Sequence, residues 1–452
     1  MPLSSSSPSA PAASFVAAVR RAMRHNAATL RAHPFAELSG SLGDLGTLLP
    51  LLLALAAQGS VSLPGTLVLS GLFNIASGAV FGVPLPVQPM KAIAAAAISH
   101  RGDADPAAVA AAGMAVGALC FVLAASGLLR RAAAAVPVPV VKGIQLGAGL
   151  SLATGPAAAL LAPLPWVRPW LDNRLWALAI FTLLLTTQRT PRFPTALLAI
   201  TLGLVLAVAS NPSSLPSFSP WLPRSALTPQ LTPGALSMAV GQAPLTLLNS
   251  VVAVSALSAD LIPHVPAPSV TTLAYSVALM NAVGPWFGCM PVCHGSGGLA
   301  AQVRFGARSG ASVMLLGTLK IAVGLFIGAQ LGPLLAAFPR SVLGVTVLAA
   351  GLELARAAAT LNRGAADLLE PVGGRRVSRM LGDEERVERW NVMLMTAALA
   401  LAFKSDAVGF VGGLACHVSY VVGPRVADWW DARSRGSRSL SDRARERMPL
   451  LG

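Results

Sequence analysis

The chain has 452 residues, of which 54% are hydrophobic and only 11% are charged, and its mean hydropathy is +0.66. This composition excludes an ordinary soluble enzyme and indicates a polytopic membrane protein. The formal net charge of +15 does not indicate a nucleic-acid partner, because the arginines are spread over loops and tails rather than gathered in one basic domain.

The hydrophobic pattern predicts about fourteen membrane segments. Two of them are half-helices, too short to cross a hydrocarbon core of about 30 Å. In chain order the predicted segments are 37–57, 64–83, 88–99 (half-helix), 107–129, 136–154, 173–188, 194–210, 234–257, 270–287, 293–303 (half-helix), 310–331, 339–358, 390–404 and 406–423. Residues 155–172, rich in Pro and Trp, are predicted to lie at the membrane interface.

These segments predict a domain order and a topology. The order is a cytosolic N-terminal tail (1–35), a first transmembrane repeat (36–210), a Pro-rich linker (211–233), a second repeat (234–423) with a loop at 363–389, and a C-terminal tail (424–452). An even number of spans puts both tails on one side. Most loop arginines fall on that side, so the positive-inside rule places both termini and the 363–389 loop in the cytosol.

Two distant stretches share one unusual pattern. Residues 81–94 read FGVPLPVQPMKAIA and residues 287–300 read FGCMPVCHGSGGLA, and their Pro-Val pairs begin 205 positions apart, at Pro86 and Pro291. A second match, GLSLA at 149–153 and GLELA at 351–355, recurs after 202 positions. An interrupted helix at corresponding places in both halves is the signature of an inverted-repeat transporter. The predicted fold is therefore all-α, with two inverted seven-segment repeats.

The interruptions favour an anionic substrate. Irregular backbone at membrane depth must be buried in protein or line a watery cavity. The first N–H groups of each half-helix lack intrahelical acceptors, so two helix starts aimed at one point would provide partial positive charge from both sides.

Four longer motifs resemble a known family. They are ELSGSLGDLGT at 37–47, PVQPMKAIAAAAIS at 86–99, GQAPLTLLNSVVAVSALSADL at 241–261 and PVCHGSGGLAAQVRFGARSG at 291–310. Together they look like the molybdate transporter family of plants, algae and fungi, a branch of the sulfate-permease superfamily without its cytosolic regulatory domain. The resemblance implies a uracil-permease-like fold, with a core domain from segments 1–4 and 8–11 and a gate domain from segments 5–7 and 12–14.

The candidate substrate ligands lie at the two interruptions and on the eighth segment. They are Gln88, Pro89, Lys91, Gln242, Cys293, His294, Gly295, Ser296, Gly297 and Gly298. Polar side chains can donate to an oxyanion and glycines allow close backbone approach. Pro89 suits the first turn of a helix. His294 could instead be a neutral histidine satisfied by backbone.

A second set of residues could contact the substrate or couple its transport to protons. This set is Ser39, Asp44, Thr47, Thr246 and Asn249. A carboxylate inside a membrane is a functional candidate, but Asp44 could equally be the structural partner of Lys91. Lys91 in turn could bind the anion, snorkel to the surface, or pair with Asp44 or Glu37.

Several other residues are expected to have structural roles. Glu37 lies near the membrane boundary, Asp260 could solvate a loop, and Lys320 could be the buried partner of an acid elsewhere in the chain. Arg304 and Arg308 follow the second half-helix, where the negative end of the helix dipole favours cations. The four cysteines have no metal spacing and are expected to be buried free thiols, so no metal and no cofactor are predicted.

The predicted function is secondary active transport of molybdate by alternating access, with sulfate or another tetrahedral oxyanion as the alternative substrate. A membrane-embedded enzyme and a non-transporting sensor are the alternatives of a different class; the first lacks a nucleophile–base pair or cofactor motif and the second lacks a signalling domain. Partners are the lipid bilayer, the oxyanion, a coupling proton and a second copy in a homodimer. The last residues, ERMPLL, resemble an acidic dileucine sorting signal through Glu446, Leu450 and Leu451. This favours the vacuolar membrane, with the plasma membrane second.

Overall fold

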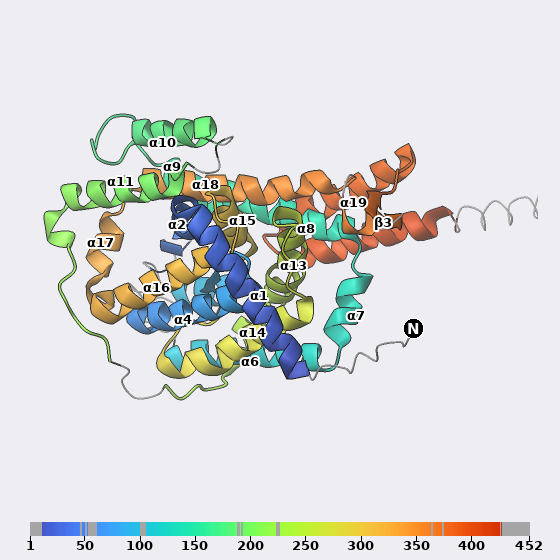
Figure 1. Ribbon diagram of the computed structural model, residues 1–452, viewed down its shortest axis with the longest axis horizontal. Helices are drawn as coiled ribbons and strands as arrows, with labels where there is room; N and C mark the ends of the chain where they lie inside the picture. The colour runs from blue at the N-terminus through green and yellow to red at the C-terminus, as the bar shows by residue number, and fades with distance from the viewer. Residues whose placement is uncertain are drawn as a thin grey trace, which may run out of the picture.

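A computed structural model describes residues 11–45, 48–49, 52, 61–99, 105–187, 190, 193–222, 227–362, 365–372, 375–424 and 426. Thr47 and the dileucine residues Glu446, Leu450 and Leu451 lie outside these residues. The fold is a bundle of helices with two short antiparallel strand pairs (Figure 1).

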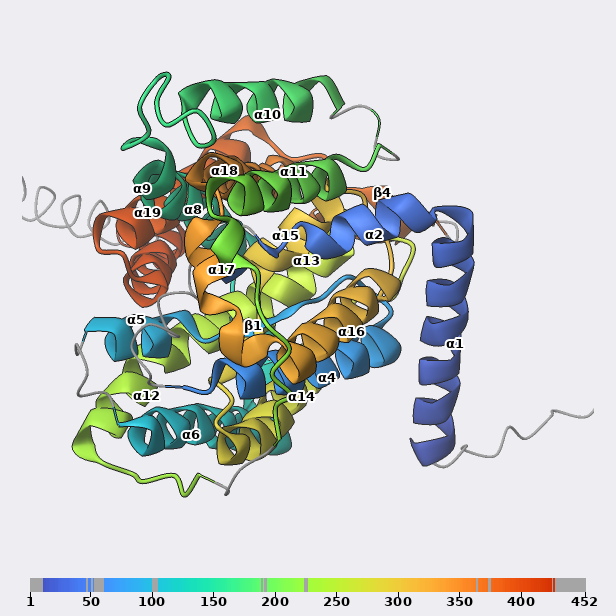
Figure 2. The ribbon, with the colours of Figure 1, turned by 90° about the vertical axis from the view of Figure 1, so that its left-hand side faces the viewer.

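The chain begins with α1 (Pro11–Ala32) and α2 (Pro34–Leu42). The expected N-terminal tail therefore contains a long helix, which contacts α4 and α16 and stands at the right-hand edge of the molecule in Figure 2. Asn26 anchors it: the amide donates to the carbonyl of Gly78 at 2.8 Å and accepts from the N–H of Gly310 at 2.9 Å.

The first repeat contains one short strand among its helices. Its elements are α4 (Leu63–Phe81), β1 (Val87–Pro89), α5 (Lys91–Ser99), α6 (Pro106–Ala125), α7 (Leu128–Ala135), α8 (Val138–Leu152), η1 (Ala153–Ala157), α9 (Ala158–Leu161), α10 (Arg174–Thr187) and α11 (Thr195–Ser210). The expected span 136–154 continues without a break to Leu161, because the π-helical turn η1 absorbs Pro156 inside the helix. The stretch 155–172, expected to lie at the membrane interface, therefore loses residues 155–161 to this helix.

The second repeat follows the same plan. After η2 (Pro212–Ser214), it has α12 (Pro233–Leu245), η3 (Thr246–Ala253), α13 (Val254–Leu261), α14 (Val270–Val283), η4 (Gly284–Phe287), β2 (Val292–His294), α15 (Ser296–Arg304), α16 (Ala311–Phe326), η5 (Gly328–Gln330), α17 (Gly332–Ala337), α18 (Arg340–Arg356), η6 (Ala357–Thr360), η7 (Ala366–Leu368), β3 (Leu369–Val372), β4 (Arg375–Ser378) and α19 (Asp383–Ala402). A last helix spans Asp406–Pro424.

Hydroxyl side chains set where several of these helices begin. Ser62 accepts from the N–H of Gly65 at the start of α4, Thr232 from Ala235 at the start of α12, and Ser269 from Thr272 at the start of α14. Each bond satisfies one of the orphan donors of a helix start. Among the described residues, six helices are long and apolar enough to cross a membrane, and three shorter apolar helices accompany them. The total of fourteen segments stays a prediction.

Equivalent residues of the two repeats meet at two places. Strand β1 pairs with β2, and Gly149 of α8 packs against Gly351 of α18. At the second contact a Cβ on Gly149 would lie 2.5 Å from the carbonyl oxygen of Gly351, so the helices touch backbone to backbone. Such meetings of equivalent elements are what a two-fold axis between inverted repeats produces.

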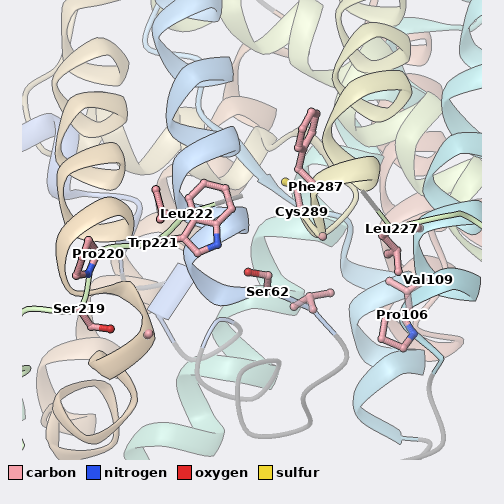
Figure 3. Close-up of a pocket in the computed structure, with 14 residues that line it drawn as sticks. Ser62, Pro106, Val109, Ser219, Pro220, Trp221, Leu222, Leu227, Phe287 and Cys289 are labelled. Atoms are coloured by element: carbon pink, nitrogen blue, oxygen red, sulfur yellow. The ribbon is translucent and has the colours of Figure 1, made fainter. Parts of the chain in front are cut away.

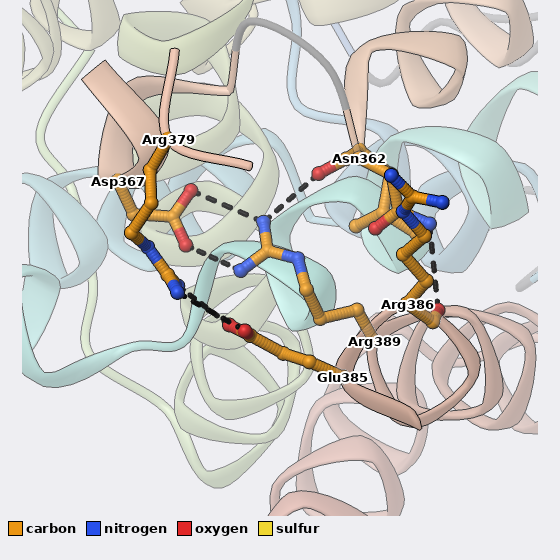
Figure 4. Close-up of polar contacts among 7 residues, drawn as sticks. Asn362, Asp367, Arg379, Glu385, Arg386 and Arg389 are labelled. Carbon is orange, nitrogen blue, oxygen red and sulfur yellow. Dashed lines mark hydrogen bonds and ion pairs between the residues drawn. The ribbon is translucent and has the colours of Figure 1, made fainter. Parts of the chain in front are cut away.

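The loop before α19 is tied down by ion pairs (Figure 4). Arg379 contacts Glu385 at 2.6 Å and Arg389 contacts Asp367 at 2.5 Å, whereas the pair of Arg386 with Asp383, at 3.0 Å, lies within α19 itself. Helix α19 begins at Asp383, seven residues before the expected start at 390, because three acidic residues occupy its first turn, where the helix dipole favours them.

Candidate functional site

The centre of the fold is the pairing of β1 with β2, where Val87 opposes His294, Gln88 opposes Cys293 and Pro89 opposes Val292. Each strand leads directly into a half-helix: β1 into α5 and β2 into α15. The expected half-helices 88–99 and 293–303 therefore begin three residues later than expected, at Lys91 and Ser296. Pro89 lies in the strand rather than in the first helical turn, because the backbone of each interruption forms a cross-repeat ladder instead of another helical turn.

Two asparagines hold the strands in place. Asn74 of α4 accepts from the N–H of Val87 at 2.7 Å. Asn281 of α14 accepts from the N–H of Val292 at 2.9 Å and donates to the carbonyl of the same residue at 2.6 Å. Both asparagines are fully buried, so they satisfy backbone groups that water cannot reach. The sequence signal was present, since an asparagine precedes each strand by a similar interval, but its role was not predicted.

Gln88 lies beside the start of α15. Its amide donates to the carboxylate of Asp44, and Asp44 also interacts electrostatically with Lys320 of α16. A Cβ on Gly298 would lie 2.8 Å from both Asp44 Oδ1 and Gln88 Nε2, and a Cβ on Gly295 would collide with Gln88 Oε1. Because these glycines have no side chain, Gln88 and Asp44 can pack directly against the backbone at the start of α15. The Nζ atom of Lys320 donates to the carbonyl of Val87 at 3.1 Å, and Asp44 is an acid that interacts electrostatically with this lysine.

The helix formed by α12, η3 and α13 contacts both half-helix starts. Gln242 accepts from the N–H of Ala92 in the first turn of α5 at 2.8 Å and donates to Thr246 at 2.9 Å. Asn249 accepts from the hydroxyl of Ser296, the first residue of α15, at 2.5 Å. Gln242 and Asn249 are seven residues apart, about two turns or roughly 10 Å. This helix is π-helical around Asn249, a distortion frequent at functional sites.

The remaining candidates lie in different surroundings. Cys293 is buried and its thiol accepts from Ser250 at 3.3 Å. Lys91 is exposed and interacts electrostatically with Cys293 and with Asp406 of the last helix. His294 shares the strand face of Val87, with its Nε2 atom 3.0 Å from the hydroxyl of Ser276 and its ring edge-on to Phe81. Ser39 accepts from the N–H of Ala196 at the start of α11, on the other side of α2 from the strands.

Three residues outside the expected ligand set acquire partners. Glu37 accepts from the N–H of Arg308 at 2.9 Å, in keeping with a structural role. Asp260 is not a loop-solvating residue: it forms a buried ion pair with Lys142 of α8, which also donates to the carbonyl of Ala357 at 3.0 Å. Lys142 was not singled out in the sequence, since its partners lie 118 and 215 positions away.

A cavity of about 640 Å³ lies elsewhere, between α4, α6, η4 and the linker (Figure 3). Ser62, Trp221 and Cys289 line it, mostly with apolar surface. Linker residues on its border are hydrogen-bonded to the helices: the N–H of Trp221 donates to the carbonyl of Leu325 and that of Leu227 to the carbonyl of Trp286. Because neither half-helix start lines this cavity, its size does not make it the anion site.

Comparison with known proteins gives concordant results. The family model described as "Molybdate transporter of MFS superfamily" matches residues 36–152 and 234–354. Molybdate transporter 2 of Arabidopsis thaliana is 36% identical, covering 84% of this chain and 86% of the relative. Molybdate transporter 1 of Arabidopsis thaliana is 40% identical (72% and 80%), and Molybdate transporter 1 of Chlamydomonas reinhardtii is 31% identical (90% and 96%).

Solved structures define the fold. The transmembrane domain of the cyanobacterial bicarbonate transporter BicA superposes with a TM-score of 0.52 at 18% identity, covering 84% of this chain and 97% of that one. The murine anion transporter Slc26a9, in its inward-facing state, superposes with a TM-score of 0.56 at 13% identity, covering 94% and 74%. The fold is thus the uracil-permease-like one, with two half-helices at crossed strands, although the family description mentions the MFS superfamily. The chain is a multi-pass integral membrane protein that belongs to the molybdate transporter family.

Proposed function

We propose that this protein moves molybdate across a membrane by alternating access, with the dianion held between the starts of α5 and α15. The observation that carries the proposal is that one helix contacts both starts, through Gln242 and Asn249. The substrate of the named relatives supports molybdate in particular. Helix-start N–H groups and neutral amides suit a dianion that must bind and also leave, because they supply partial rather than full positive charge.

The polar groups at the site lie on two sides of the proposed position of the dianion. The N–H groups in the first turn of α15 provide donors on one side, next to Ser296, whose hydroxyl donates to Asn249. The start of α5 and Lys91 provide the other, and Asp44 lies within reach as a proton-coupling carboxylate through Gln88. Sulfate is the second candidate, because it is also a tetrahedral dianion. Proton coupling, a homodimer, the vacuolar membrane and cytosolic termini belong to this proposal as further expectations.

Uptake of labelled molybdate into proteoliposomes tests the proposal. We expect saturable uptake that survives an excess of sulfate, and about tenfold lower uptake for Asn249→Ala, which removes the acceptor of Ser296. Asn211→Ala is the matched control, since Asn211 is exposed and far along the chain from the strands. Equal uptake by both variants would remove Asn249 from the site. Complete suppression by sulfate would favour the sulfate alternative, and no uptake of either ion would reject transport.

A further inference from the structure

A small polar cavity lies where α15 ends. It measures about 110 Å³ and is lined by Thr187, Thr190, Thr195, Arg304, Arg308 and Arg356. We call it the seam pocket, because α15 belongs to the core domain whereas α10, α11 and α18 belong to the gate domain. The half-helix separates it from the strand crossing: Ser296 and Arg304 are eight residues apart, about 12 Å along a helix.

Backbone bonds hold two of the three guanidinium groups in place. Arg304 donates to the carbonyl of Leu184 in the last turn of α10 at 3.0 Å, across the seam. Arg308 donates to the carbonyls of Val303 and Ala307 at 2.7 and 2.6 Å. A guanidinium has five N–H donors, so each arginine keeps donors beyond those that anchor it.

The charges of the seam pocket are not balanced by its acids. Glu353 lines the pocket and attracts Arg304 and Arg308. Glu37 also attracts Arg308, but its carboxylate accepts from that residue's backbone N–H. Among the described lining residues, one carboxylate thus faces three guanidinium groups, and Arg304 and Arg356 repel each other. Holding like charges together is costly unless an anion joins them.

We propose that the seam pocket is a second oxyanion site, which takes a tetrahedral dianion such as molybdate or sulfate. Guanidinium forks match the oxygen pairs of such ions, and the threonine hydroxyls add donors from the gate side. This inference goes beyond transport through the strand crossing, and the site binds its ion whether or not the crossing carries it. Because core and gate both line the pocket, an ion there also stabilises the arrangement that brings α15 against α10 and α18.

Equilibrium binding of labelled molybdate to the purified full-length protein tests the inference. We expect two classes of site in the wild type. Arg356→Gln should weaken one class by about tenfold and leave the other unchanged, and it should fold normally because Arg356 is exposed. Glu353→Gln should act in the opposite direction and tighten the same class several-fold, since it removes a like charge. Arg131→Gln, at another exposed arginine on α7, is the matched control.

Three results of these binding measurements would overturn or separate the proposed sites. A single class of site in the wild type, or two classes that neither Arg356→Gln nor Glu353→Gln changes, would overturn the seam site. Weakening by Arg131→Gln as strong as by Arg356→Gln would show a general charge effect and overturn it as well. Gln88→Ala should affect only the other class, so failure of the strand-crossing site and failure of the seam site give different results.

Discussion

Lys91 and Asp44 have different neighbours in the folded protein. Asp44 accepts a hydrogen bond from Gln88 and interacts electrostatically with Lys320, whereas Lys91 interacts electrostatically with Cys293 and Asp406. Of the two hypotheses for Lys91, anion ligand and partner of Asp44, these neighbours favour the first, because a different lysine, Lys320, interacts with Asp44. We therefore expect Lys91, which is exposed at the start of a half-helix, to contact the substrate.

We therefore predict that Lys91→Gln weakens molybdate binding by about tenfold, as expected for losing a charged hydrogen bond of about 1.5 kcal/mol. The melting temperature without molybdate should stay unchanged. Lys91→Arg should restore binding only in part, because a planar fork differs in reach from an ammonium. Thermal shift with and without molybdate measures both effects. A variant that melts earlier yet keeps its molybdate affinity would instead assign Lys91 a structural role.

The glycines of α15 allow a sharper test at a single carbon atom. A Cβ on Gly298 would lie 2.6 Å from Pro86 Cγ and 2.8 Å from the Gln88–Asp44 pair, whereas a Cβ on Gly297 would meet only Leu152, at 3.0 Å. Gly298→Ala should abolish uptake or lower stability by about 1–3 kcal/mol through overpacking, and Gly297→Ala should be tolerated. Uptake and melting temperature of the two variants decide; equal behaviour would contradict the described packing.

At the scale of elements, the strands explain what sequence patterns can and cannot predict. The interruptions were visible in the sequence because Pro-Val and glycine-rich turns break two apolar runs at matching places. The pairing of β1 with β2 was not visible, because strands of three residues, one of them containing Pro89, have no period-2 pattern and their partners lie 203 to 207 positions away. The same holds for the Lys142–Asp260 pair, since nothing local to Lys142 signals an acid on α13.

Asn74 and Asn281, the two asparagines that hold β1 and β2 in place, are expected to contribute unequally to stability. Asn281→Ala leaves two backbone groups of Val292 unpaired, whereas Asn74→Ala leaves one group of Val87. Each buried unpaired group costs about 1–3 kcal/mol. Asn281→Ala should therefore lower the melting temperature more than Asn74→Ala, with molybdate protection reduced in both. A larger loss of melting temperature for Asn74→Ala than for Asn281→Ala would show that the number of hydrogen bonds does not set the contribution of each asparagine.

At the scale of the whole molecule, the ion pair between Lys142 and Asp260 joins the gate domain to the core domain. Alternating access requires these domains to move past each other, so contacts across their boundary set the balance of conformations. Gln145 of α8 adds a second link by donating to the carbonyl of Ala253 at 3.2 Å. These bonds link the two domains in the described arrangement.

Removing the ion pair should loosen the link between the two domains. Lys142→Met alone should be strongly destabilising, by about 3–5 kcal/mol, because it leaves a buried carboxylate unpaired. The double variant Lys142→Met with Asp260→Leu should recover stability and expose Cys293, which is only 6% exposed, to maleimide. Cys293→Ser in the same background is the control for labelling of other thiols. Unchanged labelling in the stable double variant would show that the pair does not hold the domains together.

The central claim is that molybdate binds where the two half-helices begin. Molybdenum scatters anomalously, so a crystal of the protein grown with molybdate can be measured on both sides of the molybdenum absorption edge. We expect the strongest anomalous peak beside Ser296 and Gln88, between the starts of α5 and α15. A fully occupied peak elsewhere, with none between these helix starts, would contradict it.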